Sequence, residues 1–181
     1  MKVVLLDRDG VLNEDRADYV KNPGELAIIP GVGEAIALLN AAGVKIAIVS
    51  NQSVVGRGII SLAMLEQINA HLITELRKAG AKIDLFLVCT DAPGQPSERR
   101  KPAPGMLREA LTHFRAQPID AVMIGDQLSD LRAAKAAGVA RFLVRTGKGA
   151  QTQAQGLPVD ILPVAVYNSL MEAAVSLAPK A

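Results

Sequence analysis

The chain is poor in cysteine, in net charge and in long apolar runs, and each shortage excludes a class of protein. Its 181 residues include a single cysteine, Cys89, so no disulfide can form within the chain. Twenty basic and 18 acidic side chains leave a formal charge of +2, too small a surplus to predict a nucleic-acid or anionic-membrane surface. The apolar run at the amino terminus stops at Asp7, far too early for a signal peptide or a membrane span. We therefore expect a cytoplasmic protein whose partners include neither nucleic acid nor a membrane.

The composition is typical of one packed domain. Half of the residues are hydrophobic and 21% are charged, and the length suits a single core. There is no internal repeat, and the proline-rich stretch at 93–104 lies between strand and helix signals, which is typical of a loop. We expect one domain over residues 1–181. We also expect a monomer, because no long apolar stripe is left over once the predicted sheet is covered.

Short apolar runs alternate along the chain with segments of helical spacing. The runs cover residues 3–6, 44–49, 85–88, 121–124 and 142–144. They are mostly continuous instead of alternating, which is typical of parallel strands that are covered on both faces. The alternation of strand and helix predicts a three-layer, Rossmann-like α/β fold with a mostly parallel central sheet.

The predicted helices lie between these strands and have recognisable ends. Apolar side chains at helical spacing stop at Gly43 and at Gly80, both suited to a left-handed cap. A third helix is predicted to begin at Pro104, and a fourth from about Ser129 to stop at Gly138. The tail is less informative, with an apolar stretch at 159–166 and a terminal helix predicted through 170–175.

Polar side chains follow three of the predicted strands at the points where those strands end. Asp7 and Asp9 follow the first strand, Ser50 and Asn51 the second, and Asp126 the fourth. Ligands of open parallel sheets bind beyond the carboxyl ends of the strands, so we expect these side chains to converge.

The spacing of the acidic residues predicts a metal site. Asp7 and Asp9 are two residues apart, so an extended chain points both side chains to the same side, and Asp126 adds a third carboxylate. Their repulsion raises the proton affinity of at least one carboxylate unless a cation neutralises it. Oxygen ligands favour Mg²⁺, which fills its other positions with water or substrate phosphate, so a phosphate ester is the natural substrate. The alternative is that the two aspartates merely cap a turn before Gly10.

Four segments at these strand ends resemble, in order, the four motifs of the haloacid dehalogenase (HAD) superfamily of phosphatases. They are Leu-Leu-Asp-Arg-Asp-Gly-Val at 5–11, Ile-Val-Ser-Asn-Gln at 48–52, Arg-Lys-Pro-Ala-Pro-Gly-Met at 100–106 and Ile-Gly-Asp-Gln-Leu-Ser-Asp at 124–130. The resemblance implies a HAD-type fold, and no segment is long enough to form a large cap domain. Within the superfamily, residues 50–58 and 143–148 are most similar to the heptose bisphosphate phosphatases, a subfamily related to the histidinol-phosphate phosphatases.

The resemblance implies a role for each polar residue at the strand ends. Asp7 is expected to attack phosphorus and form an aspartyl phosphate. Asp9, with a raised pKa, is expected to protonate the leaving oxygen and then deprotonate the attacking water. Ser50, the backbone around Asn51 and the Lys101 ammonium are expected to bind the phosphoryl oxygens.

The metal and the remote part of the substrate are assigned in the same way. The resemblance implies Mg²⁺ bound by the side chains of Asp7 and Asp126 and by the backbone carbonyl of Asp9, with Asp130 beside this ligand set. The residues expected to contact a second phosphate or sugar hydroxyls are Arg57, Arg100, Asn13, Asp15 and Asp18.

The implied activity is removal of the 7-phosphate of heptose 1,7-bisphosphate during synthesis of the lipopolysaccharide core precursor. Three alternatives stay open. The chain could be a histidinol-phosphate phosphatase, a generalist sugar phosphatase, or a receiver-like module that binds Mg²⁺ and phosphate without turnover.

One loop departs from the pattern of the superfamily. Many relatives hold a structural zinc in the loop before the lysine motif, using a Cys-x-His pair and a Cys-x-Cys pair. Here only Cys89 is in a ligand-like position, Asp91 replaces the histidine, and the later cysteines are absent. We therefore predict no structural zinc, and we expect Cys89 to be a small apolar residue at a strand end.

Overall fold

The computed structural model, which describes residues 1–95 and 97–178, contains one sheet of six parallel strands in the order β3-β2-β1-β4-β5-β6. The strands are β1 (Val3–Leu6), β2 (Lys45–Asn51), β3 (Leu85–Cys89), β4 (Ala121–Gly125), β5 (Ala140–Val144) and β6 (Ala165–Tyr167). The α-helices are α1 (Val32–Ala41), α2 (Ser53–Gly56), α3 (Leu62–Lys78), α4 (Gly105–Phe114), α5 (Leu128–Ala137), α6 (Gly149–Ala154) and α7 (Leu170–Leu177). This architecture confirms the predicted α/β class and the five predicted strands.

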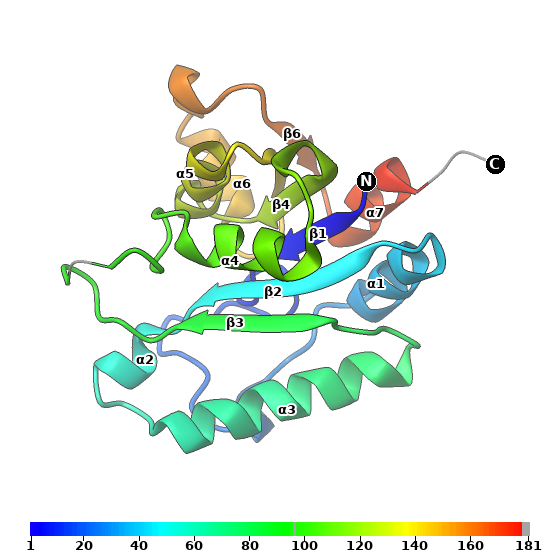
Figure 1. Ribbon diagram of the computed structural model, residues 1–181. Coiled ribbons are helices and arrows are strands. Elements are labelled where there is room, and N and C mark those ends of the chain that lie inside the picture. The colour runs from blue at the N-terminus through cyan, green and yellow to red at the C-terminus, as the bar shows by residue number, and fades with distance from the viewer. Residues whose placement is uncertain (96, 179–181) are drawn as a thin grey trace.

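Both faces of the sheet are covered, which explains why the strands read as continuous apolar runs. In β1, Val4 and Leu6 pack in one core cluster with residues of α1, α3 and α7, whereas Val3 and Leu5 pack in the other with residues of α4 and α5. Successive side chains of a strand point to opposite faces, so every residue of β1 is buried. The two groups of helices lie on opposite sides of the sheet (Figure 1).

Most helix ends follow from local chemistry. Ser61 accepts a hydrogen bond from the Met64 backbone N–H and caps α3, and Gly80 follows its carboxyl end with φ of 81°. Gly138, with φ of 72°, ends α5 as predicted. The start predicted for the third helix is wrong by one residue, because Pro104 is the cap and α4 begins at Gly105.

The carboxyl-terminal part of the sheet was not predicted. Strand β6 has only three half-buried residues, paired with β5 through Phe142–Val144. Its apolar pattern is too short to distinguish a strand from a loop. Helix α7 was predicted, and Leu170, Ala173 and Ala174 bury its inner face.

Strand order creates one crevice at the carboxyl edge of the sheet. The chain leaves β1 toward β2 and β3 on one side, then returns to place β4 on the other side of β1. Connections that diverge from a central strand leave a gap above its carboxyl end, where ligands bind. The ladder between β1 and β4 continues to Asp7, whose backbone N–H donates to Ile124 O at 3.1 Å.

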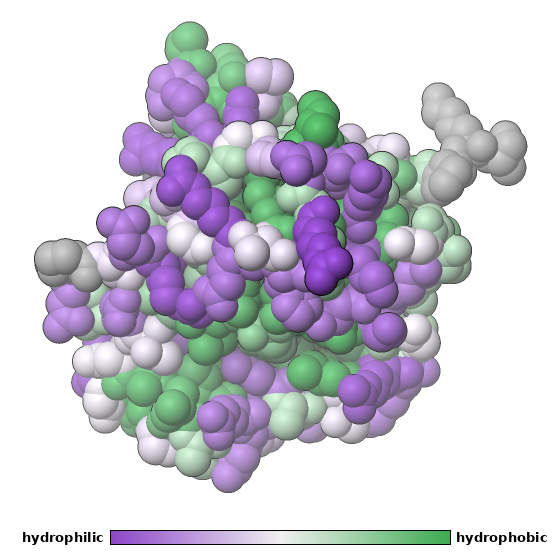
Figure 2. Space-filling model, in the orientation of Figure 1, coloured by the Kyte–Doolittle hydropathy of each residue, from purple (hydrophilic) through white to green (hydrophobic). Residues whose placement is uncertain are grey.

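Among the described residues, the connections between strands consist of loops and at most two α-helices, as in α2 and α3 between β2 and β3, so the predicted absence of a large cap domain is confirmed. Figure 2 shows hydrophilic side chains over most of the face that it presents, with apolar side chains in smaller patches. No described helix combines the length and the apolar composition needed to cross a membrane.

Candidate active site

A buried ion-pair network forms the floor of the crevice. The Lys101 ammonium lies 2.9 Å from Asp7 Oδ1 and 2.7 Å from Asp130 Oδ1, and its side chain is 1% exposed. The Arg8 backbone N–H also donates to Asp7 Oδ1, at 2.7 Å. No described residue donates a hydrogen bond to Asp7 Oδ2, so Asp7 keeps one oxygen for an incoming group.

Three buried carboxylates lie close together at this network, and Lys101 pairs with two of them. One oxygen each of Asp7, Asp126 and Asp130 lies within 4.8 Å of the other two. Asp126 Oδ1 is buried and has no hydrogen-bond partner among residues 1–95 and 97–178. When all three carboxylates are ionised, the Lys101 ammonium balances one of them and leaves a net charge of −2. One divalent cation would neutralise that charge. An all-oxygen set of this kind fits Mg²⁺.

The carboxylates repel one another as the sequence predicted. Burial, opposed by Lys101 and reinforced by Asp130, raises the pKa of Asp7 to about 6. Burial, reinforced by the charges of Asp7 and Asp130, raises the pKa of Asp126 to about 8. Burial alone would lower the pKa of Lys101, but the Asp130 and Asp7 carboxylates outweigh it and hold the pKa above its ordinary value.

The loop between β5 and α6, together with Thr152 of α6, holds Asp126 in place. The Lys148 backbone N–H donates to Asp126 Oδ2 at 2.8 Å, and the Thr152 hydroxyl donates to the Asp126 carbonyl at 2.8 Å. Gly10 and Gly147 lie against the same carboxylate, and a Cβ on either would stand 2.1 and 2.4 Å from Asp126 Oδ2. Only glycine fits at these two positions, so Asp126 is fixed from both sides.

The Asp9 side chain accepts hydrogen bonds from neighbouring residues and is not part of the cluster of Asp7, Asp126 and Asp130. Its carboxylate accepts from Arg8 Nη2 at 2.9 and 3.0 Å, from Asn13 Nδ2 at 2.9 Å and from Gln52 Nε2 at 2.6 Å. Burial acts to raise the pKa of Asp9, but the Arg8 charge and these hydrogen bonds hold it below its usual value. The predicted raised pKa of Asp9 is therefore wrong, because the residue between the two aspartates is a buried arginine. The Asp9 backbone carbonyl as a metal ligand stays a prediction.

The end of β2 positions the residues around it. Asn51 accepts from the Lys101 backbone N–H at 3.0 Å and donates to the Lys101 carbonyl at 2.9 Å, so it fixes the lysine loop on the strand. Gln52 Nε2 donates to Ser50 Oγ at 2.8 Å as well as to Asp9. Ser50 is 1% exposed and lies beneath the cavity wall, so its predicted contact with a phosphoryl oxygen stays untested.

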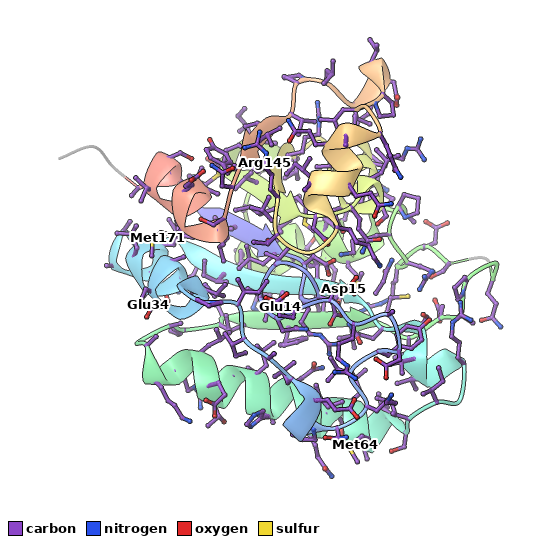
Figure 3. All side chains as sticks on the ribbon, turned by 180° about the vertical axis from the view of Figure 1, so that it is seen from behind. Glu14, Asp15, Glu34, Met64, Arg145 and Met171 are labelled. Atoms are coloured by element: carbon purple, nitrogen blue, oxygen red, sulfur yellow. The ribbon has the colours of Figure 1, made fainter. Side chains whose placement is uncertain are left out.

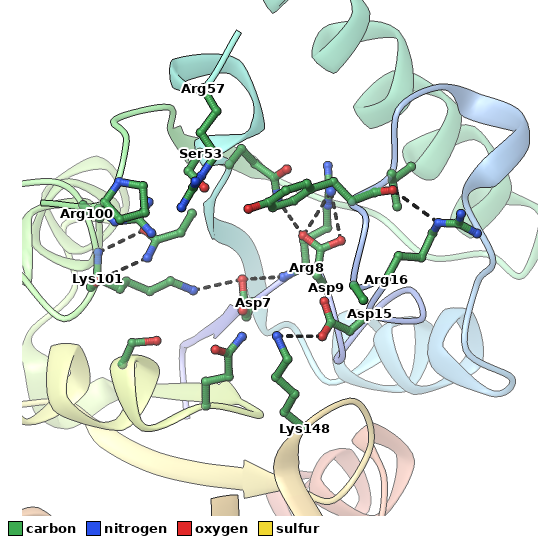
Figure 4. A pocket seen from close by; sticks show the side chains of 18 residues that line it. Asp7, Arg8, Asp9, Asp15, Arg16, Ser53, Arg57, Arg100, Lys101 and Lys148 are labelled. Carbon is green, nitrogen blue, oxygen red and sulfur yellow. Dashed lines mark hydrogen bonds and ion pairs between the residues drawn. The ribbon is translucent and has the colours of Figure 1, made fainter. Parts of the chain in front are cut away.

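A cavity of about 410 Å³ opens above this floor. Its charged lining side chains are Asp7, Asp9, Asp15, Arg8, Arg16, Arg57, Arg100, Lys101 and Lys148. Figure 4 shows Asp7 and Lys101 facing each other, with Arg57 and Arg100 on one side and Lys148 on another. Of these cations, Arg57 and Arg100 form no ion pair with a described residue, so their charge suits a phosphorylated ligand.

The three residues predicted on the loop after β1 have different places. Asp15 lines the cavity, where Lys148 Nζ pairs with it at 2.9 Å, and Figure 3 shows it in front of the central strands when the molecule is seen from behind. Asn13 is fully buried and does not line the cavity. Its Nδ2 donates hydrogen bonds to Asp9 Oδ1 and to the Glu14 carbonyl. Asp18 is exposed, lies outside the cavity lining and pairs with surface cations. The structure thus gives no support to sugar contacts by Asn13 and Asp18.

Hydrogen bonds stabilise the loop for which we predict no zinc. Cys89 is buried at the end of β3, and its Sγ donates to Asp91 Oδ2 at 3.2 Å. The Ser97 hydroxyl donates to the same carboxylate oxygen, and Arg100 Nη1 donates to the Asp91 carbonyl at 3.0 Å. Asp91 therefore accepts hydrogen bonds from both ends of the loop.

Comparison with known proteins agrees with this geometry. A HAD-hydrolase-like family model matches residues 98–173. The chain is 40% identical to the D-glycero-β-D-manno-heptose-1,7-bisphosphate 7-phosphatase of Pseudomonas putida over 162 residues, which cover 90% of this chain and 93% of that one. The corresponding enzyme of Pseudomonas aeruginosa is 39% identical over 88% and 90% of the two chains. The chain belongs to the HAD-like heptose-bisphosphate phosphatase family. A crystal structure of the Bordetella bronchiseptica D,D-heptose 1,7-bisphosphate phosphatase, complexed with magnesium and phosphate, is 37% identical and superposes with a TM-score of 0.92 over 98% of each chain.

Sequence reasoning missed several residues of this HAD-like site. Arg8 and Gln52 hold Asp9, and Lys148 contacts both Asp126 and Asp15. Tyr19 lines the cavity with a φ of 64°, a left-handed conformation that is uncommon for a tyrosine. The sequence did contain a signal that Arg8 belongs to the site. It lies between two aspartates predicted to share a pocket, so its own side chain starts close to that pocket.

The close approach of Gly10 to Asp126 predicts a selective effect on metal binding. Gly10 and Gly156 have φ of 82° and 86°, but nothing lies within 4 Å of a Cβ at Gly156. We expect Gly10→Ala and Gly156→Ala each to lose about 1–2 kcal/mol of stability from backbone strain. Only Gly10→Ala should also weaken Mg²⁺ binding, by about 10-fold or more in calorimetry, because its methyl group displaces Asp126. Equal Mg²⁺ affinity in the two variants would contradict this account of the Asp126 position.

The raised pKa values predict that stability depends on pH and on metal. Between the ordinary Asp value of 3.8 and about 8, the folded protein holds protons that the unfolded chain has lost, so stability falls as pH rises. In EDTA we expect Tm to fall from about pH 5 to pH 8, and saturating Mg²⁺ to restore about 5 °C or more at the higher pH. Differential scanning calorimetry measures both effects. Asp126→Asn should stabilise the protein in EDTA at the higher pH and respond little to Mg²⁺, and a full Mg²⁺ response in this variant would refute the assigned site.

Proposed function

We propose that the chain is a Mg²⁺-dependent phosphatase that removes the 7-phosphate of D-glycero-D-manno-heptose 1,7-bisphosphate in synthesis of the lipopolysaccharide core precursor. The relatives that cover nine-tenths of the chain carry the name of this activity. The observation that carries the chemical part is the buried cluster of Asp7, Asp126 and Asp130, whose charge one ammonium and one divalent cation would balance. Family membership favours a hydrolase over a receiver-like binding module.

Asp7 is the proposed nucleophile. Its carboxylate attacks phosphorus in line, forms the new O–P bond and displaces the sugar oxygen. Asp9, once protonated, gives its proton to that oxygen as it leaves and later takes a proton from the water that hydrolyses the aspartyl phosphate. This role requires Asp9 to take up a proton although Arg8 holds its pKa below the usual value. Lys101, held at 2.9 Å from Asp7, stabilises negative charge on the transferred group, and Ser50 and the backbone around Asn51 assist it.

The metal completes this arrangement. The side chains of Asp7 and Asp126 and the Asp9 carbonyl would hold Mg²⁺, while Asp130 would orient Lys101 beside it. When bound, Mg²⁺ supplies positive charge that stabilises the phosphoryl oxygens. The same charge would offset the repulsion between the carboxylates, which together with burial raises the pKa of Asp126.

Two arginines are the proposed partners of the second phosphate. Arg57 and Arg100 line the cavity, and neither forms a side-chain ion pair with a described residue. Arg100 Nη1 is tied to the Asp91 carbonyl, which orients its guanidinium without neutralising it. Guanidinium groups bind phosphate oxygens in pairs of hydrogen bonds, so an uncompensated pair fits the phosphate that is not cleaved. We extend the proposal to a cytoplasmic monomer with a small phosphorylated sugar as its partner.

A substrate comparison tests the proposed function. With Mg²⁺, we expect kcat/KM for heptose 1,7-bisphosphate to exceed that for histidinol phosphate by at least about 10-fold, or roughly 1.4 kcal/mol of transition-state preference. EDTA and Asp7→Asn should each abolish turnover. Equal rates on the two substrates would indicate a generalist phosphatase. Absence of Mg²⁺-dependent turnover on every ester in a panel would indicate a binding module.

The role of the two arginines is tested by substrates with one or two phosphates. We expect Arg57→Gln and Arg100→Gln each to raise KM for the bisphosphate about 10-fold, because each removes a charge-assisted contact. The value of kcat/KM for phenyl phosphate should change less than about two-fold, because that substrate lacks the second phosphate. Arg16→Gln is the matched control, since Arg16 also lines the cavity but pairs with Asp18. A loss of the same size on both substrates would place these arginines at the reacting phosphate instead.

A further inference from the structure

A buried arginine links the proposed acid to a helix that does not line the cavity. The Arg8 side chain is 2% exposed, and its Nη2 binds both oxygens of Asp9 at 2.9 and 3.0 Å. Its Nη1 donates to Asn69 Oδ1 at 3.0 Å, across 61 positions of the sequence. Asn69 lies in α3, and the residues that line the cavity do not include it.

Because the guanidinium group is planar and rigid, the hydrogen bond to Asn69 also restrains the side of Arg8 that binds Asp9. The two terminal nitrogens lie in one rigid plane, so fixing Nη1 also fixes the direction in which Nη2 points. The amide oxygen of Asn69 therefore restrains the nitrogen that holds Asp9. Burial strengthens the restraint, because a buried guanidinium that loses a partner cannot replace it with bulk water.

Helix α3 is a firm support for such a restraint. Ile68 and Leu72, on either side of Asn69 along the helix, are fully buried in the core. Ser61 caps the amino terminus of the helix through Met64 N–H. Asn69 is half-buried at the edge of this apolar face. Its position on a packed helix holds the amide oxygen within reach of Arg8.

We propose that Asn69 is a positioning residue for protonation of the leaving group, acting through Arg8 on Asp9. This inference rests on the proposed function, in which Asp9 is the general acid. Asn13 and Gln52 also bind Asp9, but Arg8 is the partner that approaches from the α3 side and contacts both carboxylate oxygens. Without Asn69, the Arg8 plane can rotate and carry Asp9 away from the leaving oxygen.

The proposal has a consequence that depends on the substrate. When the bond between phosphorus and the leaving oxygen breaks, that oxygen takes the electron pair, and an alkoxide also needs the proton from Asp9. A nitrophenolate is stable without that proton, so an aryl phosphate with this group depends little on Asp9. The value of kcat/KM covers the steps through the first bond cleavage, so later hydrolysis of the aspartyl phosphate does not enter the comparison.

The experiment measures kcat/KM with Mg²⁺ on 4-nitrophenyl phosphate and on the sugar bisphosphate, and compares the ratio between variants. Asn69→Leu keeps the size of the side chain and removes the acceptor. Asn69→Asp keeps an acceptor oxygen, and Gln67→Leu is the matched control, since Gln67 is an exposed side chain on the same helix. Asp9→Asn gives the effect of losing the acid outright.

We expect the aryl-to-sugar ratio to rise about 10-fold in Asn69→Leu, because a small displacement of an acid has a large effect on proton transfer. The ratio in Asn69→Asp and in Gln67→Leu should stay within about two-fold of the wild-type ratio. An equal loss on both substrates in Asn69→Leu, with the ratio unchanged, would show a merely structural role and overturn the proposal.

The Asp9→Asn variant distinguishes a wrong inference about Asn69 from a wrong assignment of Asp9 as the acid. If Asp9→Asn raises the ratio about 100-fold while Asn69→Leu leaves it unchanged, Asp9 is the acid and the positioning role of Asn69 is wrong. If Asp9→Asn itself leaves the ratio unchanged, the proposed acid is wrong and the inference about Asn69 falls with it.

Discussion

The structure depends on the burial of three carboxylates beside a single ammonium. Lys101 is paired with Asp7 and Asp130 and almost fully buried, and Asp126 completes the group within 4.8 Å. Removing so many charges from water is strongly unfavourable unless each finds a partner. Lys101 compensates one carboxylate, and the rest of the cluster is stable only with a proton or with a cation. A divalent ion would relieve this imbalance, which is why the cluster suits the proposed Mg²⁺ site.

The topology explains why these groups meet although they are far apart in the chain. Asp7 and Asp126 follow β1 and β4, which are neighbours in the sheet on either side of the point where the strand order reverses. Glycines at positions 10 and 147 allow two backbone segments to lie directly against Asp126. The loop that carries Lys148 then connects Asp126 to the cavity wall at Asp15. The HAD-like sheet thus supplies the floor of the cavity, and short loops supply much of its wall.

The parts of the site that sequence predicted well are those fixed by the ends of buried strands. Asp7 and Asp126 were found because continuous apolar runs locate the strands, and a polar side chain directly after such a run has few other places to lie. The electrostatic state of Asp9 was not predictable in the same way. It depends on the direction of the Arg8 side chain, which donates hydrogen bonds to Asp9 and to Asn69 of α3, and a polar residue on a helix looks in sequence like any surface residue. Strand β6 escaped prediction for a different reason, because three half-buried residues carry no periodic signal.

Locating the metal tests the proposed carboxylate site most directly. Mn²⁺ has oxygen-ligand preferences close to those of Mg²⁺ and scatters X-rays anomalously, so a crystal of the protein grown with Mn²⁺ reports the position of the ion. We expect one anomalous peak bounded by the carboxylates of Asp7 and Asp126, with Lys101 still paired to Asp130. A peak elsewhere in the molecule, or an ordered Asp7 and Asp126 without a peak between them at saturating Mn²⁺, would contradict the proposed site.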